Sequence, residues 1–91
     1  MRVRATVHRG EIVGFVVQYE ARLGDAWHPI VRFDTAHGFA HRDLIHPNGR
    51  IDKQPLPWAH YSVALTFATQ ELKASWPRYR RAYEEERRHG A

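Results

Sequence analysis

The residues that could do chemistry are concentrated between positions 31 and 46, where the chain reads Val-Arg-Phe-Asp-Thr-Ala-His-Gly-Phe-Ala-His-Arg-Asp-Leu-Ile-His. At alternating positions this stretch carries Arg32, Asp34, His41 and Asp43. A histidine beside an aspartate suits proton transfer near neutral pH, because the carboxylate orients the ring and favours its charged form. An arginine can hold a phosphate or a charged transition state through paired donors. These groups together match the needs of metal-independent RNA cleavage.

Each of these residues has an expected catalytic role. His41 is the general base or acid and Asp34 orients it, while Arg32 stabilises the phosphate and Asp43 positions Arg32. A second proton carrier is expected among three residues: His37, which is preferred, His46 and Glu20. The alternative is a set of cross-strand ion pairs on a solvated sheet face, which contribute little.

A metal site is the rival chemistry for the same stretch. His37 and His41 are spaced H-x-x-x-H, and Asp34, Asp43 and His46 are nearby. On a helix this spacing puts both imidazoles on one face, but here a turn and a strand are expected. The chain has no cysteine and no H-E-x-x-H motif. The sequence therefore favours chemistry without a metal or other cofactor.

Glycine-containing turns divide the first half of the chain into segments with period-two patterning, which is typical of strands. The turns fall at positions 9–10, 24–25, 37–38 and 48–49. The expected strands are 2–8, 11–23, about 27–36, about 39–46 and 50–54. Alternation predicts a buried set (the odd positions from 13 to 23, Trp27, Val31, Phe33, Leu44) and an exposed set (His28, Arg32, Asp34).

A hairpin about His37-Gly38 would bring the candidate residues together. It pairs Asp34 with His41, Phe33 with Arg42, Arg32 with Asp43, and Val31 with Leu44. A slip by one residue would swap the two faces, so burial selects this register. Opposed side chains are then close enough for Asp34–His41 and Arg32–Asp43 to bond on the uncovered side of the sheet. A three-residue turn between the second and third strands would add Gln18, beside Arg32, and Glu20.

From Trp58 onward the period becomes helical. The apolar stripe comprises Tyr61, Leu65, Ala68, Leu72, Trp76, Tyr79 and Tyr83. Pro77 predicts either a kink or two helices that meet near Trp76. The expected fold is α+β: an antiparallel β-meander of four to five strands with a C-terminal helix, kinked near Pro77, packed on one face.

Length and charge limit the classes of protein that fit. Ninety-one residues make a single domain, 1–91. The absence of cysteine and of a signal-like or membrane-spanning segment favours a cytoplasmic protein without membrane contact. The formal charge of +4 suits a polyanion, and the expected nucleic-acid-binding residues are Arg42, Arg78, Arg80 and Arg81. A solvated helix is the alternative for the C-terminal arginines, because three glutamates intervene at 84–86.

The stretch from Val31 to Gly38, followed by His41, resembles small uncharacterised prokaryotic domains with the motif Arg-(Phe/Tyr)-Asp-Thr-Ala-His-Gly-x-x-His-x-Asp. It is more distantly similar to TumE-type toxins of toxin–antitoxin modules, which carry Arg-Tyr-Asp-(Asn/Thr)-Ala before a histidine-rich stretch. Those toxins are small basic proteins thought to act on RNA. The residues that match are Arg32, Asp34, His37 and His41. After Ala36 this chain lacks the doubled histidines and the proline of the toxins.

The resemblance and the polar stretch together lead to one principal functional hypothesis. It is a toxin-like endoribonuclease with an RNA substrate and a separate antitoxin protein as partner. The alternatives are a non-catalytic module that binds nucleic acid or protein, and a small metal-dependent hydrolase. Exposed edge strands at 2–8 and 50–54 also allow a homodimer formed by strand addition.

Overall fold

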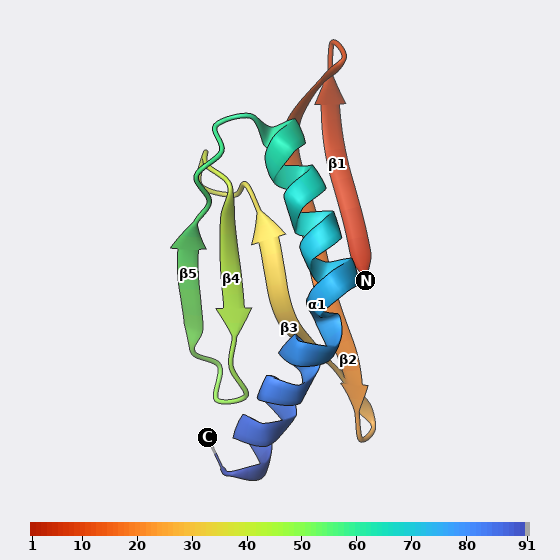
Figure 1. Ribbon diagram of the computed structural model, residues 1–91, viewed down its shortest axis with the longest axis vertical. Coiled ribbons are helices and arrows are strands. Elements are labelled where there is room, and N and C mark those ends of the chain that lie inside the picture. The colour runs from red at the N-terminus through yellow and green to blue at the C-terminus, as the bar shows by residue number, and fades with distance from the viewer. Residues whose placement is uncertain (91) are drawn as a thin grey trace.

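The computed structural model describes residues 1–90, which form one five-stranded antiparallel sheet and one long helix (Figure 1). The strands follow one another across the sheet in chain order, as a meander. Their bounds are β1 Arg2–His8, β2 Glu11–Leu23, β3 Ala26–Asp34, β4 His41–Ile45 and β5 Ile51–Pro55, and helix α1 spans Tyr61–Arg88. The predicted α+β class and the order of elements are confirmed, β1 and β2 have the predicted bounds, and the other three strands differ from the prediction by one or two residues at each end.

The predicted register of β3 and β4 is also confirmed. The pairs are Val31 with Leu44, Arg32 with Asp43, Phe33 with Arg42, and Asp34 with His41. Burial selects this register, because Val31 and Phe33 are fully buried and a one-residue slip would turn both outward. The pairing ends at Asp34 and His41, and the six residues between them form a loop.

Gln18 pairs with Arg32 as expected, but by a different route. The turn between β2 and β3 has two residues, because Leu23 pairs with Ala26, and the register then shifts between Tyr19 and Glu20. The shift leaves Ile30 as an extra residue on β3, so that Ile30 and Val31 are both buried. An extra residue of this kind is a β-bulge.

The bulge explains two wrong predictions on β3. Before the bulge the alternation is inverted, so Trp27 pairs with Arg22 on the polar side of β2 and is 63% exposed instead of buried. His28, expected to be exposed, is half-buried and lies against Tyr83 of the helix, with ring centroids 6.0 Å apart. One inserted residue therefore exchanged the environments of two aromatic side chains.

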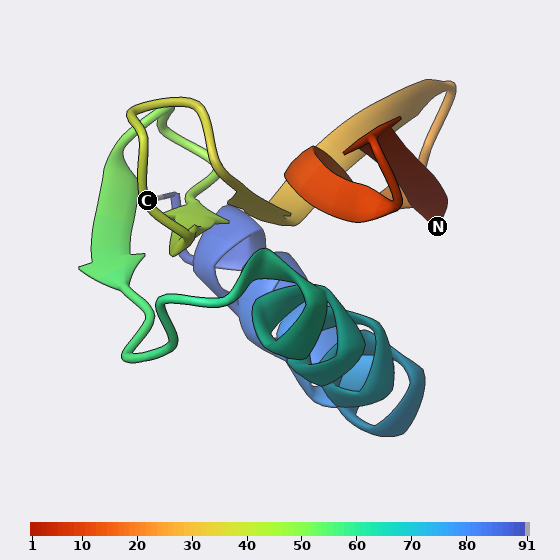
Figure 2. The ribbon, with the colours of Figure 1, turned by 90° about the horizontal axis from the view of Figure 1, so that it is seen from above.

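Helix α1 covers one face of the sheet and packs on β2 and β3 (Figure 2). The core lies between them and comprises Phe15, Val17, Tyr19, Ala21, Leu23, Ile30, Val31, Phe33, Ala40, Ala64, Ala68, Leu72, Tyr79 and Tyr83. Leu44 packs half-buried against this core, whereas Val13 and Trp76, which were expected in it, are exposed. Because β2 begins at Glu11, Val13 lies near the turn of the long β1–β2 hairpin. This hairpin extends past the helix (Figure 1).

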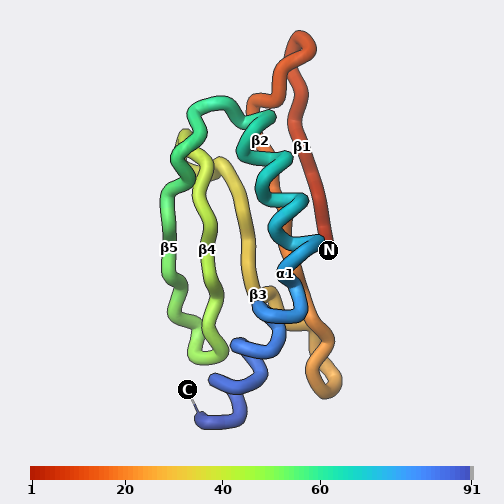
Figure 3. Tube along the Cα trace, in the orientation of Figure 1, coloured from red at the N-terminus to blue at the C-terminus, as the bar shows by residue number. Residues whose placement is uncertain are grey.

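The helix is continuous through Pro77, so the alternative of two separate helices is wrong. Its axis changes direction about halfway along, which can be followed in the tube of Figure 3. Proline lacks the N–H for an intrahelical bond and its ring crowds the preceding turn, and both effects bend a helix. Among residues 1–90, no helix is long and apolar enough to cross a membrane.

Candidate functional site

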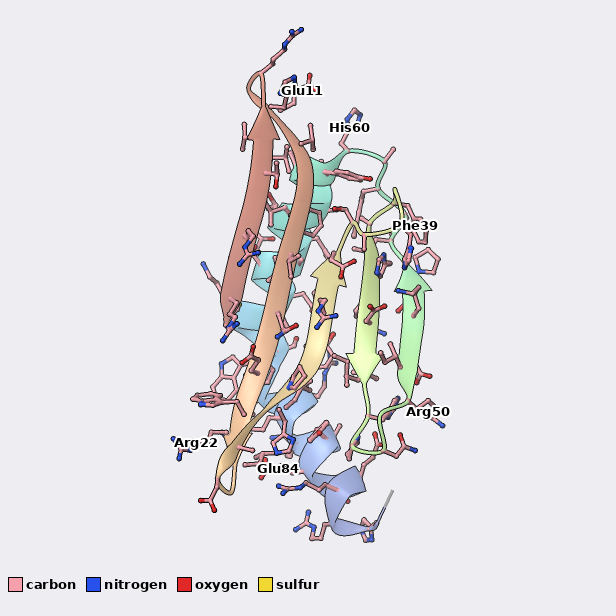
Figure 4. The ribbon with its side chains drawn as sticks, turned by 180° about the vertical axis from the view of Figure 1, so that it is seen from behind. Glu11, Arg22, Phe39, Arg50, His60 and Glu84 are labelled. Atoms are coloured by element: carbon pink, nitrogen blue, oxygen red, sulfur yellow. The ribbon has the colours of Figure 1, made fainter. Side chains whose placement is uncertain are left out.

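The face of the sheet that the helix leaves uncovered carries a row of polar side chains across all five strands (Figure 4). The register places one residue of each strand in this row: Arg2, Gln18, Arg32, Asp43 and Lys53. The neighbouring row contains Asp34 and His41. The strand pairing thus gathers Arg32, Asp34, His41 and Asp43 on one face, as the sequence predicted.

Arg32 and Asp43 have partners other than those expected. The Arg32 Nε donates to Gln18 Oε1 at 2.7 Å, although Arg32 lies opposite Asp43. The partner of Asp43 is Lys53, whose Nζ donates to Oδ1 at 2.8 Å. The expected ion pair between Arg32 and Asp43 is therefore replaced by two separate contacts.

One acidic group, Glu20, holds the outer part of the row together. Glu20 Oε1 accepts a hydrogen bond from Gln18 Nε2 at 2.7 Å and lies 3.2 Å from Arg2 Nε. Gln18 thus fixes Arg32 through its carbonyl oxygen and is itself fixed by Glu20. Among the contacts of residues 1–90, none uses the terminal Nη nitrogens of Arg32, so they remain available to a ligand.

His41 lies at the centre of the site and is buried, with 1% of its surface exposed. Its Nε2 is 2.7 Å from Asp34 Oδ1 and 3.6 Å from Asp43 Oδ2. Asp34, which the alternation predicted to be exposed, and Asp43 are 7% and 6% exposed. The alternative of cross-strand ion pairs on a solvated face is therefore wrong for these three residues, because all three are buried.

The loop between β3 and β4 seals this cluster. The ring of His37 stacks on His41 with centroids 5.8 Å apart, and the ring of Phe39 lies 5.4 Å from it. The backbone N–H of Ala36 donates to Asp34 Oδ1 at 3.1 Å, which ties the start of the loop to the cluster. His37 itself is exposed, so the loop places one accessible imidazole directly over one inaccessible imidazole.

Arg42 lies on the other face, beneath the helix. Its Nη1 donates to the Tyr79 hydroxyl at 3.1 Å, and that hydroxyl donates to Glu71 at 2.8 Å. Burial raises the pKa of Tyr79 above its usual value and the bond to Glu71 acts in the same direction, whereas the bond from Arg42 opposes both. Arg42 therefore serves the packing of the helix rather than the polar face.

The other three expected nucleic-acid-binding arginines, Arg78, Arg80 and Arg81, lie on α1, on the opposite side of the sheet from His41. Arg80 pairs with Glu84 at 3.1 Å, one helical turn away. Arg78 reaches Glu71 at 3.5 Å. The structure thus divides the expected site residues between two faces and does not bring these arginines to the His41 cluster.

The sequence did not predict a second buried histidine cluster at the other end of β4. His46 Nε2 lies 2.7 Å from Asp52 Oδ2, and His46 Nδ1 lies 2.8 Å from Glu86 Oε2. These two hydrogen bonds raise the pKa of His46 above its usual value, although burial and the charge of Arg50 act the other way. The hydrogen bond between Asp52 and His46 in turn lowers the pKa of Asp52. In the sequence this cluster is indicated only by His46 and by the run of three glutamates at 84–86, and His46 and Glu86 are 40 residues apart.

The two clusters differ in what they could hold. Among residues 1–90, the group whose donor atoms converge as a metal would require is Asp34, His41 and Asp43, with all three atoms within 4.8 Å of one another. His37 and His46, which belong to the metal set suggested by the sequence, are not in this group.

Fold and site together define a class: a small α+β domain whose meander is covered on one face by a single helix and carries a buried acid–histidine cluster near the other. The chain belongs to the family described as Domain of unknown function (DUF7718), whose model matches residues 1–89. Neither a curated protein nor a solved structure matches the chain.

Proposed function

We propose that this protein is a toxin-like endoribonuclease whose uncovered sheet face receives RNA. The observation that supports it is the placement of an exposed imidazole, His37, beside a polar row that offers the cations Arg32 and Lys53. The resemblance of residues 31–41 to TumE-type toxins favours RNA as the substrate, as does the formal charge of +4.

In this proposal the 2′-hydroxyl of RNA loses its proton to His37 and attacks the adjacent phosphorus. The 5′-oxygen of the next nucleotide leaves and takes a proton from water, which gives a 2′,3′-cyclic phosphate and a free 5′-hydroxyl, and the protonated His37 gives its proton to the hydroxide. Arg32 holds the non-bridging oxygens through its unused Nη donors, which stabilises the charge that develops there. His41 and Asp34 act as positioning residues, because their burial keeps them from the substrate.

The proposal is tested by cleavage of RNA oligonucleotides and by growth arrest on expression. His37→Ala should lower the cleavage rate by about 100-fold or more, a typical effect of losing a proton carrier. The melting temperature should not change, because His37 is exposed. His8→Ala is the matched control: this residue is also exposed, but it lies at the far end of β1 and should leave cleavage intact. A wild-type protein that cleaves no RNA, or a His37→Ala variant as active as wild type, would contradict the proposal.

A second candidate is a non-catalytic module that binds nucleic acid. The observation that favours it is the burial of His41, Asp34 and Asp43, since these groups cannot touch RNA. Such a module would bind RNA with an affinity that falls as salt rises, and would leave the RNA intact. Gel-shift and cleavage assays on the same samples separate the two candidates.

The proposed toxin would have an antitoxin protein as partner, and a second copy of the chain is a further candidate. Every residue of both edge strands, β1 and β5, is exposed, and an unpaired edge can accept another strand. Light scattering on the purified chain would distinguish a monomer from a dimer. Co-purification with the product of an adjacent small gene would test for the antitoxin.

A further inference from the structure

The buried His41 has one ring nitrogen, Nε2, without a hydrogen-bond partner among residues 1–90. Two carboxylate oxygens lie near it, yet Asp34 Oδ1 at 2.7 Å is out of line with the nitrogen and Asp43 Oδ2 at 3.6 Å is too far away for a hydrogen bond. Buried polar atoms are almost always paired, so an unpaired nitrogen between two acids needs a physical explanation.

The other ring nitrogen decides which form of His41 is present. Nδ1 lies 3.3 Å from the carbonyl oxygen of Phe39, which can only accept a hydrogen bond. Nδ1 therefore carries a hydrogen, and in the neutral ring Nε2 has a bare lone pair. A lone pair 2.7 Å from the Asp34 carboxylate is repelled by it unless a positive charge lies between them.

The position of the carboxylates suits a metal ion better than a proton. A metal bound to imidazole lies on the axis of the lone pair, about 2.0–2.1 Å from the nitrogen, and receives its other ligands from the side. Asp34 Oδ1 approaches Nε2 from off this axis and Asp43 Oδ2 lies beyond hydrogen-bond distance, and both positions allow coordination of an ion on the axis.

We propose that Asp34, His41 and Asp43 form a binding site for one divalent transition-metal ion. Their donor atoms converge within 4.8 Å of one another. The Ala36 N–H donates to Asp34 Oδ1, so this carboxylate is oriented before an ion arrives. One imidazole and two carboxylates suit Zn²⁺ or Mn²⁺, and three protein ligands leave a position for water.

The same ion would fix the loop between β3 and β4. Asp34 and His41 stand at the two ends of this loop, and His37 stacks on the ring that the ion would hold. This inference does not depend on the proposed RNA chemistry, because ion binding is measured without RNA.

Equilibrium dialysis of chelator-treated protein against ZnCl₂ or MnCl₂, followed by elemental analysis, tests the site. The wild type should retain about one ion per chain and melt at a higher temperature with it. Asp34→Asn and Asp43→Asn, which keep the side-chain shape, should weaken binding by about 100-fold or more. Asp52→Asn is the matched control, because it removes a carboxylate from the His46 cluster and should retain the ion.

A measurement without variants covers the case in which a substitution prevents folding. Anomalous scattering at the zinc edge from wild-type crystals soaked in ZnCl₂ should place the ion against His41 Nε2 and both carboxylates. The proposal is overturned if the wild type retains no ion, if both Asn variants retain it at wild-type affinity, or if the ion lies elsewhere.

Discussion

Two buried histidines lie five residues apart on and just after β4, each between two acidic side chains, and they are used differently. His46 gives each ring nitrogen its own carboxylate, Asp52 on one side and Glu86 on the other. His41 has both of its carboxylates at a single nitrogen, which makes no hydrogen bond among residues 1–90. The clusters lie toward opposite ends of the β4–β5 hairpin, marked by Phe39 and Arg50 in Figure 4.

This difference separates a structural contact from a candidate site. The ring of His46 is saturated and joins the β4–β5 hairpin to the last turns of α1, 40 residues away in sequence. Its acids lie on opposite sides of the ring, so they cannot share one ion with it. The acids of His41 converge and leave one nitrogen open, which is the arrangement of a binding site.

The largest effect is expected from His41→Ala. This change removes a fully buried ring and leaves a cavity beside two buried carboxylates. Large-to-small substitutions in a core typically cost about 2–5 kcal/mol. Urea denaturation should show that loss in the free energy of unfolding, and a loss below about 1 kcal/mol would mean that the cluster is not held as described.

A smaller loss is expected from His46→Ala. The side chains of Asp52 and Glu86 are 57% and 38% exposed, so water can solvate both carboxylates once the imidazole is gone. We expect a decrease of about 1–2 kcal/mol in the free energy of unfolding, measured under the same conditions. A decrease as large as that of His41→Ala would remove the contrast between the two clusters.

The contribution of His46 should depend on pH in a defined direction. Asp52 and Glu86 raise its pKa in the folded state, while the charge of Arg50 opposes them. The stabilisation is therefore fully present below the unfolded histidine pKa of about 6.5 and is lost as the pH rises through the raised folded value.

The difference in unfolding free energy between wild type and His46→Ala, measured across this range, checks the prediction. The difference should shrink toward alkaline pH. A difference that grows with pH would show that His46 is held neutral in the folded protein.

The smallest effect on stability is expected from Lys53→Gln, because the Lys53 side chain is 40% exposed and such ion pairs contribute about 1 kcal/mol or less.

The Lys53→Gln change also removes a positive charge next to Asp43 and should raise the affinity of the Asp34–His41–Asp43 cluster for Zn²⁺. Arg50→Gln, beside Asp52, is the control and should leave Zn²⁺ affinity unchanged. Isothermal titration of both variants with ZnCl₂ measures their affinities. Weaker Zn²⁺ binding by Lys53→Gln than by the wild type would contradict the assigned site.

The strand pattern was predictable because local periodicity and burial act together. Val31 and Phe33 had to face the helix, and this fixed the pairing of Asp34 with His41 and of Arg32 with Asp43. The bulge at Ile30 was not predictable, since a short apolar run is compatible with either face of a strand. It exchanged the environments of Trp27 and His28.

The location of the candidate site was predictable, but its burial and ion pairing were not. Asp34 and His41 are sealed by the loop that joins them, and alternation along a strand carries no information about how a loop folds back. Lys53 and Gln18, the actual partners of Asp43 and Arg32, come from the two flanking strands. The link from His46 to Glu86 spans 40 residues and depends on where the helix ends.

Both ring nitrogens of His46 have carboxylate partners, whereas the proposed ion would bind to His41 Nε2. Long-range ¹H–¹⁵N correlation spectra of the imidazole rings, recorded before and after one equivalent of ZnCl₂, distinguish the two histidines. The His41 Nε2 resonance is expected to move to the position of a metal-bound nitrogen while both His46 resonances stay in place. An unchanged His41 resonance, or movement of His46 instead, would overturn the proposed site.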